Sequence, residues 1–444
     1  MENRFNQATR WGRRGAFSLG LAALLFAALP ASSPAQENPL PDLRAAAPPP
    51  AAAASSLKAS QLPAFSIAVA PLGFAAPGAF YVGKRNSLVS LDFLDENRLL
   101  FTFRVPGLMR RDATLTEASD ERQIRAVVLA LPSGAVLSEA LWTLHDRARY
   151  LWPLQDGHFL LRDGNEIRQG DASLELKPML RFPGPLLALE MDPTQHYMVA
   201  SSREPMPADP SALATNSGSL SGDGKPSAPR DLMLRIVRRD SGQVVLFSRL
   251  DHAIHLPINA DGYLESERGH GLEWSIYLNH FSGGRSALGQ VTSTCAPTFD
   301  FLTGSELLAT LCDTLGGNKL AAITTDGRHL WQSFAPDTAI WPLVVRAPDG
   351  SRLVRESILI SRPLSTGSSL LVDEIRGQLV EVFDAANGKR ALIVQVTPVF
   401  DAGGNVALSP SGRRVAVLNG GAIQIFELPA ATPFPAAPGD HFGR

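Results

Sequence analysis

Short apolar runs separated by tight polar turns recur along most of the chain, whereas the apolar spacing typical of helices is rare. In the first unit, an apolar run at 88–94 leads through Glu96-Asn97 to a second apolar run at 99–103. Gly, Asp and Asn at such turns supply the positive φ that tight β-hairpins need. The turns of the six further units are Asp156-Gly157, Pro193-Thr194, Asp261-Gly262, Thr303-Gly304, Asp349-Gly350 and Ser411-Gly412. The pattern predicts an all-β protein made of seven strand–turn–strand units.

A second hairpin follows most of these units, so each unit contributes four antiparallel strands. Its turns include Ser133-Gly134, Ser241-Gly242, Asp326-Gly327 and Asn387-Gly388. Two polar loops, at 106–121 and 204–229, interrupt the series. When they are left out, the unit repeats about every 43 residues between Leu88 and Leu428, which is the period of four-stranded propeller blades. We therefore predict a seven-bladed β-propeller over 64–429, with an eight-bladed ring or a two-domain β-sandwich as the alternative.

The last unit contains only three apolar runs, at 405–409, 413–418 and 422–428. A sheet edge left open in this way exposes unpaired backbone groups. We predict that a strand from the N-terminal side, either 79–83 or 65–70, completes this blade and closes the ring.

Two segments resemble known propeller families. Residues 406–428 read VALSPSGRRVAVLNGGAIQIFEL, which resembles the turn and strands of WD40-like bacterial propellers. Residues 323–331 read ITTDGRHLW, which resembles the blade edge of quinoproteins with a spacing shortened by two residues. The resemblance to exported bacterial WD40-like and quinoprotein-like β-propellers covers the architecture of about residues 80–428 and implies no functional subfamily.

The N-terminus has the pattern of a secretory signal peptide. Four arginines precede an apolar stretch at 15–29, and Ser33-Pro34-Ala35 offers small residues for cleavage. We predict a signal peptide at 1–35, cleaved after Ala35, and export to the periplasm or the medium. An uncleaved membrane anchor and twin-arginine export remain alternatives. The Ala- and Pro-rich segments at 36–63 and 430–444 are predicted to be a disordered linker and a disordered tail.

Composition and charge narrow the function classes. The chain is 45 % hydrophobic and 19 % charged, with a formal charge of −2 that falls to −5 once residues 1–35 and their four Arg and one Glu are removed. A nucleic-acid-binding protein would need a basic surface, which this balance argues against. After residue 30, no apolar run approaches the ~20 residues that a membrane span needs. We expect a monomer without stable membrane insertion.

The sequence contains few motifs that indicate catalysis or metal binding. No G-x-S-x-G nucleophile turn is present, and His252 and His255 are too close along an extended segment to converge on zinc. A quinone site would need several blade-edge tryptophans, and only Trp331 matches loosely. We predict no catalytic residue, no metal and no cofactor, although a carboxylate pair for glycoside hydrolysis has no readable sequence spacing.

The two cysteines support a sharper prediction. Cys295 and Cys312 lie at equal distances from the centre of the Thr303-Gly304 turn. Directly opposed residues of a hairpin come within disulfide reach, and export makes oxidation plausible. We predict a Cys295–Cys312 disulfide, the alternative being two free cysteines separated by a bulge near Pro297.

The predicted architecture places the long loops at 106–121 and 204–229, and the connection at 361–377, on one face. The ends of the second strands on that face are rich in charge and include Asp163, Asp313 and Asn419. Arg combined with aromatic residues is typical of recognition surfaces. The candidate ligand- or partner-binding residues are Arg104, Trp152, Arg162, Arg203, Glu204, Arg268, His270, Trp341, Arg355 and Glu356.

We therefore expect an exported binding or protein-interaction module whose partner is a protein, a small anion or a glycan on the long-loop face. An exported enzyme on a propeller scaffold, either carbohydrate-active or a quinoprotein-like oxidoreductase, is the alternative. A structural envelope protein tethered by its linker is a third possibility.

Overall fold

The computed structural model describes residues 62–78, 81–106, 121–145, 148–205, 230–252, 254–313, 317–363 and 370–435. The predicted signal peptide, nearly all of the predicted linker, most of the two long loops and the end of the predicted tail lie outside these residues. Within them, the chain forms seven antiparallel sheets and no α-helix.

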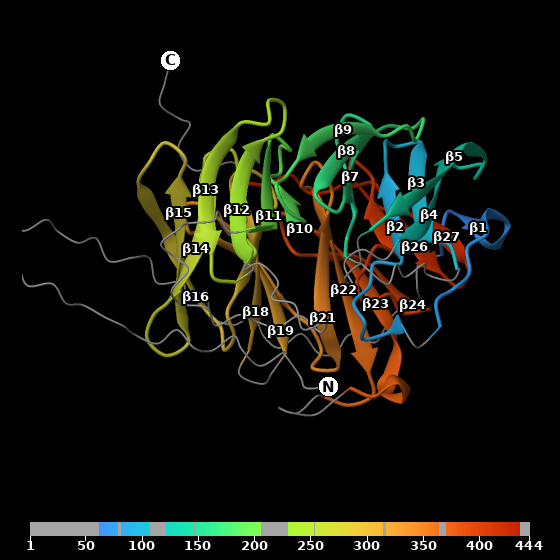
Figure 1. Cartoon of the computed structure of the whole chain (residues 1–444). Helices are drawn as coiled ribbons and strands as arrows, with labels where there is room; N and C mark the ends of the chain where they lie inside the picture. The colour runs from blue at the N-terminus through green and yellow to red at the C-terminus, as the bar shows by residue number, and fades with distance from the viewer. Residues whose placement is uncertain are drawn as a thin grey trace, which may run out of the picture.

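The sheets are the seven predicted blades (Figure 1). Each blade starts at its innermost strand, which lines the axis of the ring. Blades 1 to 3 comprise β2 (Val89–Phe93), β3 (Arg98–Arg104), β4 (Arg122–Ala130) and β5 (Val136–Leu144); β6 (Leu151–Pro153), β7 (Phe159–Asp163), β8 (Glu166–Gly170) and β9 (Lys177–Arg181); and β10 (Leu186–Met191), β11 (Tyr197–Pro205), β12 (Arg230–Arg238) and β13 (Val244–Leu250).

Blades 4 to 6 follow in the same manner. They comprise β14 (Gly262–Arg268), β15 (Glu273–His280) and β16 (Arg285–Thr292); β17 (Thr298–Phe301), β18 (Glu306–Cys312), β19 (Asn318–Thr324) and β20 (His329–Phe334); and β21 (Ala339–Arg346), β22 (Arg352–Ile360), β23 (Ile375–Asp384) and β24 (Arg390–Val396). In blade 4 the innermost strand is reduced to the bridge Ile258–Tyr263. The seven-bladed prediction is therefore confirmed.

Blade 7 is closed by the N-terminal side of the chain, as predicted. It comprises β25 (Val406–Leu408), β26 (Arg414–Asn419), β27 (Ala422–Glu427) and β1 (Phe65–Ala68). The strand β1 pairs antiparallel with β27, and Figure 1 shows the blue β1 beside the red β27. Of the two predicted closing segments, the structure uses 65–70. A 3₁₀ turn, η2 (Ala70–Leu72), follows it, and a second, η6 (Val372–Glu374), precedes β23.

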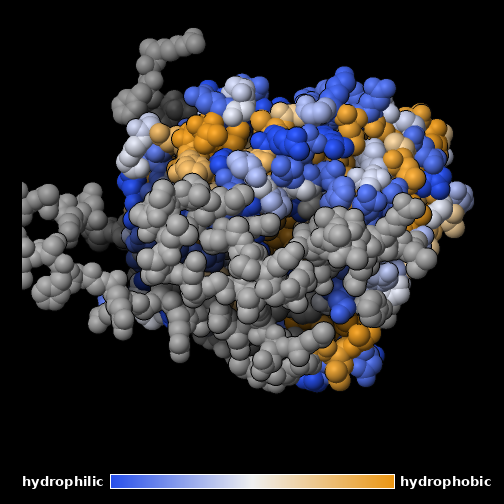
Figure 2. All heavy atoms as spheres, in the orientation of Figure 1, coloured by the Kyte–Doolittle hydropathy of each residue, from blue (hydrophilic) through white to orange (hydrophobic). Residues whose placement is uncertain are grey.

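Burial explains why inner and outer strands differ in sequence. Strands β22 and β23 lie inside blade 6 between neighbouring blades and are buried over nearly their whole length. The outermost strands β5 and β13 alternate between exposed and partly buried positions, because one side faces solvent. Figure 2 shows the resulting apolar side chains, in orange, among polar ones on the surface. Val136, Leu137 and Leu141 of β5 and Val244 and Phe247 of β13 are among the exposed apolar residues.

Glycine allows the blades to meet closely at the axis. Gly404 has a φ of +89°, and a Cβ there would lie 2.2 Å from the backbone oxygen of Val89 in blade 1. Blade 7 could not approach blade 1 this closely with any side chain at position 404. This contact brings the two ends of the ring together.

The Cys295–Cys312 disulfide is present, so that prediction is confirmed. The register on which it was based is off by one residue, because Thr298 pairs with Thr310 and Phe301 with Leu307. Beyond the ladder, the Thr294 amide donates to the Cys312 carbonyl. The register changes between Thr294 and Thr298, near the position of the bulge in the alternative prediction, but the cysteines still lie within bonding distance.

Of the predicted tail, the structure describes residues 430–435. The Thr432 amide donates to Asp384 over 2.7 Å, and Phe434 packs on the apolar cluster that contains Trp331 and Phe383. This part of the segment therefore runs along blades 5 and 6.

Candidate functional site

The innermost strands enclose a cavity of about 450 Å³ on the axis of the ring, here called the channel cavity. Its size is that of a small-molecule site. Much of the wall is apolar, as expected for strands that also form the core. Seven acidic, arginine or histidine side chains nevertheless line it: Asp92, Arg149, Glu190, His255, Asp300, Arg346 and Glu356.

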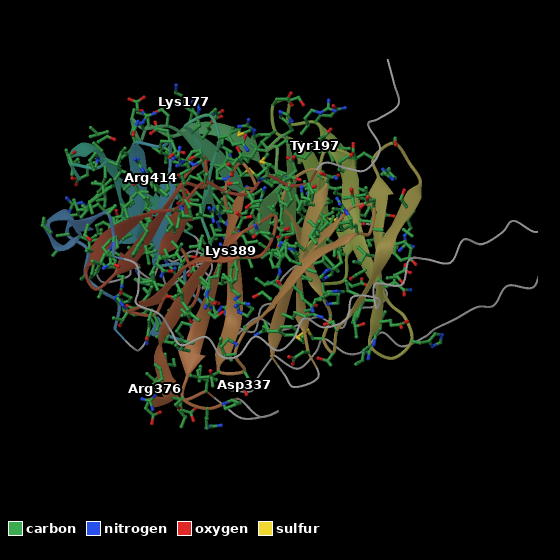
Figure 3. All side chains as sticks on the ribbon, turned by 180° about the vertical axis from the view of Figure 1, so that it is seen from behind. Lys177, Tyr197, Asp337, Arg376, Lys389 and Arg414 are labelled. Carbon is green, nitrogen blue, oxygen red and sulfur yellow. A yellow bond between two sulfur atoms is a disulfide. The ribbon has the colours of Figure 1, made fainter. Side chains whose placement is uncertain are left out.

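Strand direction defines two faces of the ring. First strands run toward the face of the first-to-second-strand turns, and second strands end on the opposite face, which carries the long loops. Figure 3 shows both faces: Lys177 and Tyr197, which begin β9 and β11, lie at the top, and Asp337 and Arg376, before β21 and in β23, lie at the bottom. The long-loop face is therefore the lower one in that view.

Hydrogen bonds cross the channel at the face opposite the long loops. The Gln155 side chain, in the turn of blade 2, donates to the Pro348 carbonyl of blade 6 over 2.9 Å and to the Pro193 carbonyl of blade 3 over 3.3 Å. Arg346, at the end of β21, donates across the ring to the Met191 carbonyl of β10 over 3.4 Å. Because blades 2 and 3 lie across the ring from blade 6, these contacts narrow that end of the channel cavity.

His255 is held between two carboxylates on the cavity wall. Its Nδ1 lies 2.7 Å from Oε1 of Glu190, and its Nε2 lies 2.7 Å from the Phe299 carbonyl and 3.4 Å from Oδ1 of Asp300. Burial lowers the pKa of His255, but the hydrogen bonds and charges of Asp300 and Glu190 outweigh it and raise the pKa to about 11. His255 is therefore a cation at neutral pH, and its charge is balanced within the site.

Arg149 and Asp92 form a second charged group in the cavity. Burial raises the pKa of Asp92 to about 6, against the opposing effects of a 2.6 Å hydrogen bond from Ser90 and of the Arg149 charge. Arg149 uses its Nε to bond the Leu151 carbonyl over 3.1 Å, and its guanidinium lies 5.3 Å from the Trp152 ring. No other hydrogen bond or ion pair joins Arg149 to the described residues.

Glu356 lies in the middle of β22 and is only 1 % exposed. Its Oε2 accepts a hydrogen bond of 2.7 Å from the Gln378 side chain, while no cation pairs with it among the described residues. Burial raises the pKa of Glu356 to about 8. The carboxyl is therefore mostly protonated at neutral pH and is able to donate a hydrogen bond.

Three buried polar atoms of the cavity wall have no hydrogen-bond partner among the described residues. They are Nη1 of Arg346, Oε2 of Glu190 and Oε1 of Glu356. A buried polar group without a partner costs free energy, and native proteins leave few of them. Here a donor, an acceptor and a protonated acid share one cavity, which is the arrangement that a polar ligand would complete.

Among the sequence-predicted site residues whose side chains the structure describes, Trp152 and Glu356 lie at the channel cavity. Arg355 is buried in blade 6 and bonds Glu381 over 2.5 and 3.0 Å. Arg162 donates to the Leu187 carbonyl over 3.1 Å. These arginines bind groups of the protein itself.

The other candidates except Trp341 lie at or next to the ends of second strands on the long-loop face. Glu204 pairs with Arg235 of the neighbouring strand, and the adjacent Arg203 is exposed. Arg268 ends β14, with its guanidinium 5.9 Å from the Trp274 ring, and His270 is exposed in the following turn. Arg104 ends β3, and Trp341 lies in β21. A binding role for these residues stays a prediction.

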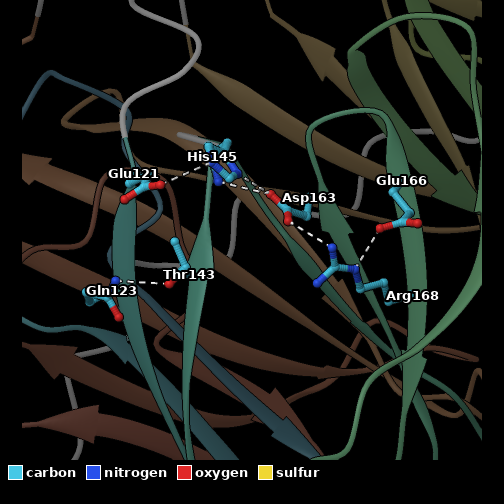
Figure 4. A network of polar contacts seen from close by, with 7 residues as sticks. All are labelled: Glu121, Gln123, Thr143, His145, Asp163, Glu166 and Arg168. Atoms are coloured by element: carbon cyan, nitrogen blue, oxygen red, sulfur yellow. Dashed lines mark hydrogen bonds and ion pairs between the residues drawn. The ribbon is translucent and has the colours of Figure 1, made fainter. Parts of the chain in front are cut away.

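Asp163, which ends β7, belongs to a polar network between blades 1 and 2 (Figure 4). His145 bonds Asp163 through Nδ1 over 2.9 Å and through its amide over 3.1 Å. Arg168 lies 3.4 Å from Asp163 and bonds Glu166 over 2.8 Å. The network ties neighbouring blades together on the long-loop face.

Sequence reasoning missed most of the cavity residues, although a local signal was present. Asp92, Glu190 and Asp300 are each a single acid between two apolar residues in the first strand of a blade: Leu-Asp-Phe, Leu-Glu-Met and Phe-Asp-Phe. A charged side chain between two apolar neighbours in the innermost strand of a blade needs an explanation. The repetition in blades 1, 3 and 5 indicates a common surface on the axis.

No group of three or more His, Cys, Asp or Glu residues among the described residues is arranged to hold a metal ion. Within the same part of the chain, no helix has the length and apolar character needed to cross a membrane.

Comparison with known proteins yields structural likeness but no family. No protein-family model matches the chain, and no curated protein matches its sequence. An acylaminoacyl peptidase of Pyrococcus horikoshii superposes with a TM-score of 0.45 at 12 % identity, covering 78 % of this chain and 52 % of the peptidase. The β-propeller domain of the Trilobed protease of Pyrococcus furiosus gives a TM-score of 0.41 at 12 % identity, covering 77 % and 94 %.

TolB of Acinetobacter baumannii is a third similar structure, with a TM-score of 0.34 at 14 % identity, covering 71 % of this chain and 73 % of TolB. The chain spans about half the length of the acylaminoacyl peptidase structures that it matches. The seven-bladed architecture described above rests on the strand order of the chain itself.

Proposed function

We propose that this protein is a binding module that takes a small polar ligand, or the polar end of a larger partner, into the channel cavity. The observation that carries the proposal is the set of three unpartnered buried atoms, on Glu190, Arg346 and Glu356, around one cavity. Burying these groups without a partner is unfavourable, so a ligand that pairs with them gains affinity from the same groups.

The cross-channel hydrogen bonds of Gln155 favour approach from the long-loop face. A macromolecular partner would contact that face, where Arg203, Arg268 and His270 are exposed. Exposed arginines near the mouth of a site suit recognition of a partner surface.

We further propose that the protein works outside the cytoplasm. The charged, apolar and small-residue pattern of residues 1–35 is that of an exported protein. The Cys295–Cys312 disulfide is compatible with an oxidising compartment. Mass determination of the N-terminus after expression with its leader tests cleavage, and the proposal predicts a chain that begins near residue 36.

Thermal-shift measurements test the cavity as the binding site. The purified chain would be heated with N-acetylated dipeptides, free amino acids, inorganic phosphate and maltotriose, each over a concentration series. A ligand at 100 times its Kd stabilises the folded state by about 2.7 kcal/mol, which is readily detected. We expect at least one class to raise the Tm of the native chain and of Arg249→Gln, an exposed arginine on the outer strand of blade 3.

The same ligand should give little or no shift with Arg346→Gln. Each shift is measured from the Tm of the variant itself, so a change in basal stability does not enter the comparison. If Arg346→Gln does not reduce the stabilisation, the ligand binds outside the channel cavity. If no class of ligand in the panel stabilises the native chain, the proposed function loses its support.

A further inference from the structure

We infer that the ligand of the channel cavity carries a carboxylate beside a nitrogen donor, as in a free amino acid or at the C-terminus of a peptide. The inference rests on the proposed function, because it concerns the chemistry of the same site. It follows from which polar atoms of the wall are available, what charge they carry and how the cavity is shaped.

Two guanidinium groups reach the cavity from different blades. Arg149 precedes β6 in blade 2, and Arg346 ends β21 in blade 6. Their only hydrogen bonds to described residues are single ones, to the Leu151 and Met191 carbonyls, and Nη1 of Arg346 is buried without a partner. Guanidinium groups bind carboxylates and phosphates through paired N–H donors.

The neighbouring charges favour an anion with a single charge. Glu190 and Asp300 balance the charge of His255, but both remain near the site where an anion would bind. Repulsion from these carboxylates rises with the charge of the ligand, and a phosphate monoester carries about 1.5 to 2 negative charges at neutral pH. A carboxylate can accept from the arginines at a smaller electrostatic cost.

A carboxylate oxygen of Glu190 lacks a hydrogen-bond donor in the described part of the chain, and a donor group on the same ligand would supply it. Oε2 of Glu190 is buried and has no hydrogen bond among the described residues, although Oε1 of the same carboxylate binds His255. An amide N–H or ammonium group beside the ligand carboxylate would satisfy it. On the opposite wall, the protonated Glu356 has a proton to donate to a carboxylate oxygen.

The shape of the cavity fits a ligand that ends inside it. Gln155, Pro193 and Pro348 narrow one end, so an extended chain would enter from the other face and stop. Partly buried apolar side chains of Met191, Leu343 and Val345 line the wall beside the charges. They would suit an apolar side chain next to the carboxylate.

Calorimetric titration with matched probes tests the inference. N-acetyl-Ala-Leu with a free carboxylate, the same peptide as its C-terminal amide, free leucine and inorganic phosphate would each be titrated into the native chain. We expect the free-carboxylate peptide or leucine to bind at least tenfold more tightly than the amide, because only the carboxylate satisfies both arginines. This comparison needs no variant and is therefore independent of any folding defect.

Variants then assign the contacts. Arg149→Gln is expected to weaken binding of the carboxylate probe about tenfold or more and to leave the weak binding of the amide nearly unchanged. Glu190→Gln should weaken both probes, because each offers the same N–H donor. Arg249→Gln is the matched control, since Arg249 lies on the exposed outer strand β13, and it should bind like the native chain.

The outcomes separate the inference from the proposed function. Equal affinity for carboxylate and amide, or binding of phosphate or maltotriose that Arg346→Gln abolishes, would overturn the carboxylate assignment while leaving the cavity as the site. Binding of none of the probes, nor of any class in the thermal-shift panel, would overturn both. Tighter binding of the dipeptide than of leucine would identify a chain end as the source, and the reverse would identify the amino acid.

Discussion

Two buried glutamates on second strands illustrate the difference between the interior of a blade and the axis of the ring. Glu204 lies near the end of β11 in blade 3, and its side chain is 9 % exposed. Glu356 lies in the middle of β22 in blade 6 and is 1 % exposed. Both carboxyls have lost most of their hydration, but they are compensated in different ways.

Glu204 is fully paired. Arg235 binds both of its oxygens, and the Ser202 hydroxyl donates to one of them over 2.6 Å. Burial raises the pKa of Glu204, but the hydrogen bonds of Arg235 and Ser202 and the Arg235 charge outweigh it, so the net pKa is lowered. For Glu356 burial acts without an opposing cation, and its pKa rises to about 8. The Glu204 carboxylate is held by its partners within the blade, and removing one partner would leave the other charge uncompensated. The Glu356 carboxyl has no cation partner among the described residues and is available to a ligand.

The largest expected effect on the free energy of unfolding comes from removing Glu204 from its ion pair with Arg235. Glu204→Ala leaves the Arg235 charge uncompensated at 14 % exposure, which should lower the free energy of unfolding by about 3 kcal/mol. Denaturant titration at pH 7 measures it, and Glu204→Ala combined with Arg235→Ala should recover part of the loss. A loss below about 1 kcal/mol would remove the distinction between the two glutamates.

Glu356, which has no cation partner in the described part of the chain, should make the free energy of unfolding fall as pH rises. The folded pKa of Glu356 lies above its usual value, so between about pH 4.5 and 8 the folded state holds more protons than the unfolded state and stability falls as pH rises. Glu356→Gln removes this term. We expect the variant to gain roughly 3 kcal/mol relative to the native chain over that window, measured as unfolding free energy at several pH values. Parallel pH curves for the two proteins would contradict the assignment.

His255 provides an intermediate case, a charge in the cavity that has partners. Its folded pKa of about 11 lies above the unfolded value, so its contribution is fully present below about pH 6.5 and is lost as pH rises toward 11. Because the side chain is 35 % exposed, solvent screening limits the effect to about 1 kcal/mol. Titration of the ring by NMR measures the pKa directly, and a value near 6.5 would show that Glu190 and Asp300 do not hold the proton.

The smallest effect on the free energy of unfolding is expected at Arg203, the exposed neighbour of Glu204. Arg203 precedes Glu204 and points to solvent, so Arg203→Ala should change the unfolding free energy by less than about 0.5 kcal/mol. Denaturant titration of Arg203→Ala and Glu204→Ala side by side compares an exposed and a paired residue of the same strand. A loss comparable to that of Glu204→Ala would mean that β11, rather than the ion pair, accounts for both.

Local patterns were enough to predict the blades. Alternating apolar positions and Gly-containing turns are short-range features of the sequence. The last unit also has three apolar runs where the repeat predicts four, which indicated that its fourth strand comes from elsewhere in the chain. Closure by one of two N-terminal segments and the Cys295–Cys312 pair followed from the same local reasoning, and the structure selects 65–68 as the closing strand. The one-residue error in the hairpin register arose at the turn, where the Leu302 amide donates to Glu306 rather than facing Ser305, so the turn is one residue longer than the two-residue turn that was predicted.

The charged positions show the limit of that reasoning. The sequence places Glu204, Arg355 and Glu356 on second strands, but it does not indicate the partner across the ladder. The structure pairs Glu204 with Arg235 and Arg355 with Glu381, and it leaves one oxygen of Glu356 without a partner. Two of these residues therefore stabilise their own blades, and the third faces the axis.

The repeat, the turns and the apolar alternation thus determined an all-β ring of seven blades and its closure, because each depends on neighbours within a few tens of residues. The channel cavity depends on ring closure. Asp92, Glu190, Asp300 and Arg346 are far apart in the chain, and they meet only because each lies on the innermost strand of a different blade. Their convergence, the burial that shifts their pKa values and the atoms left without partners are properties of the tertiary structure.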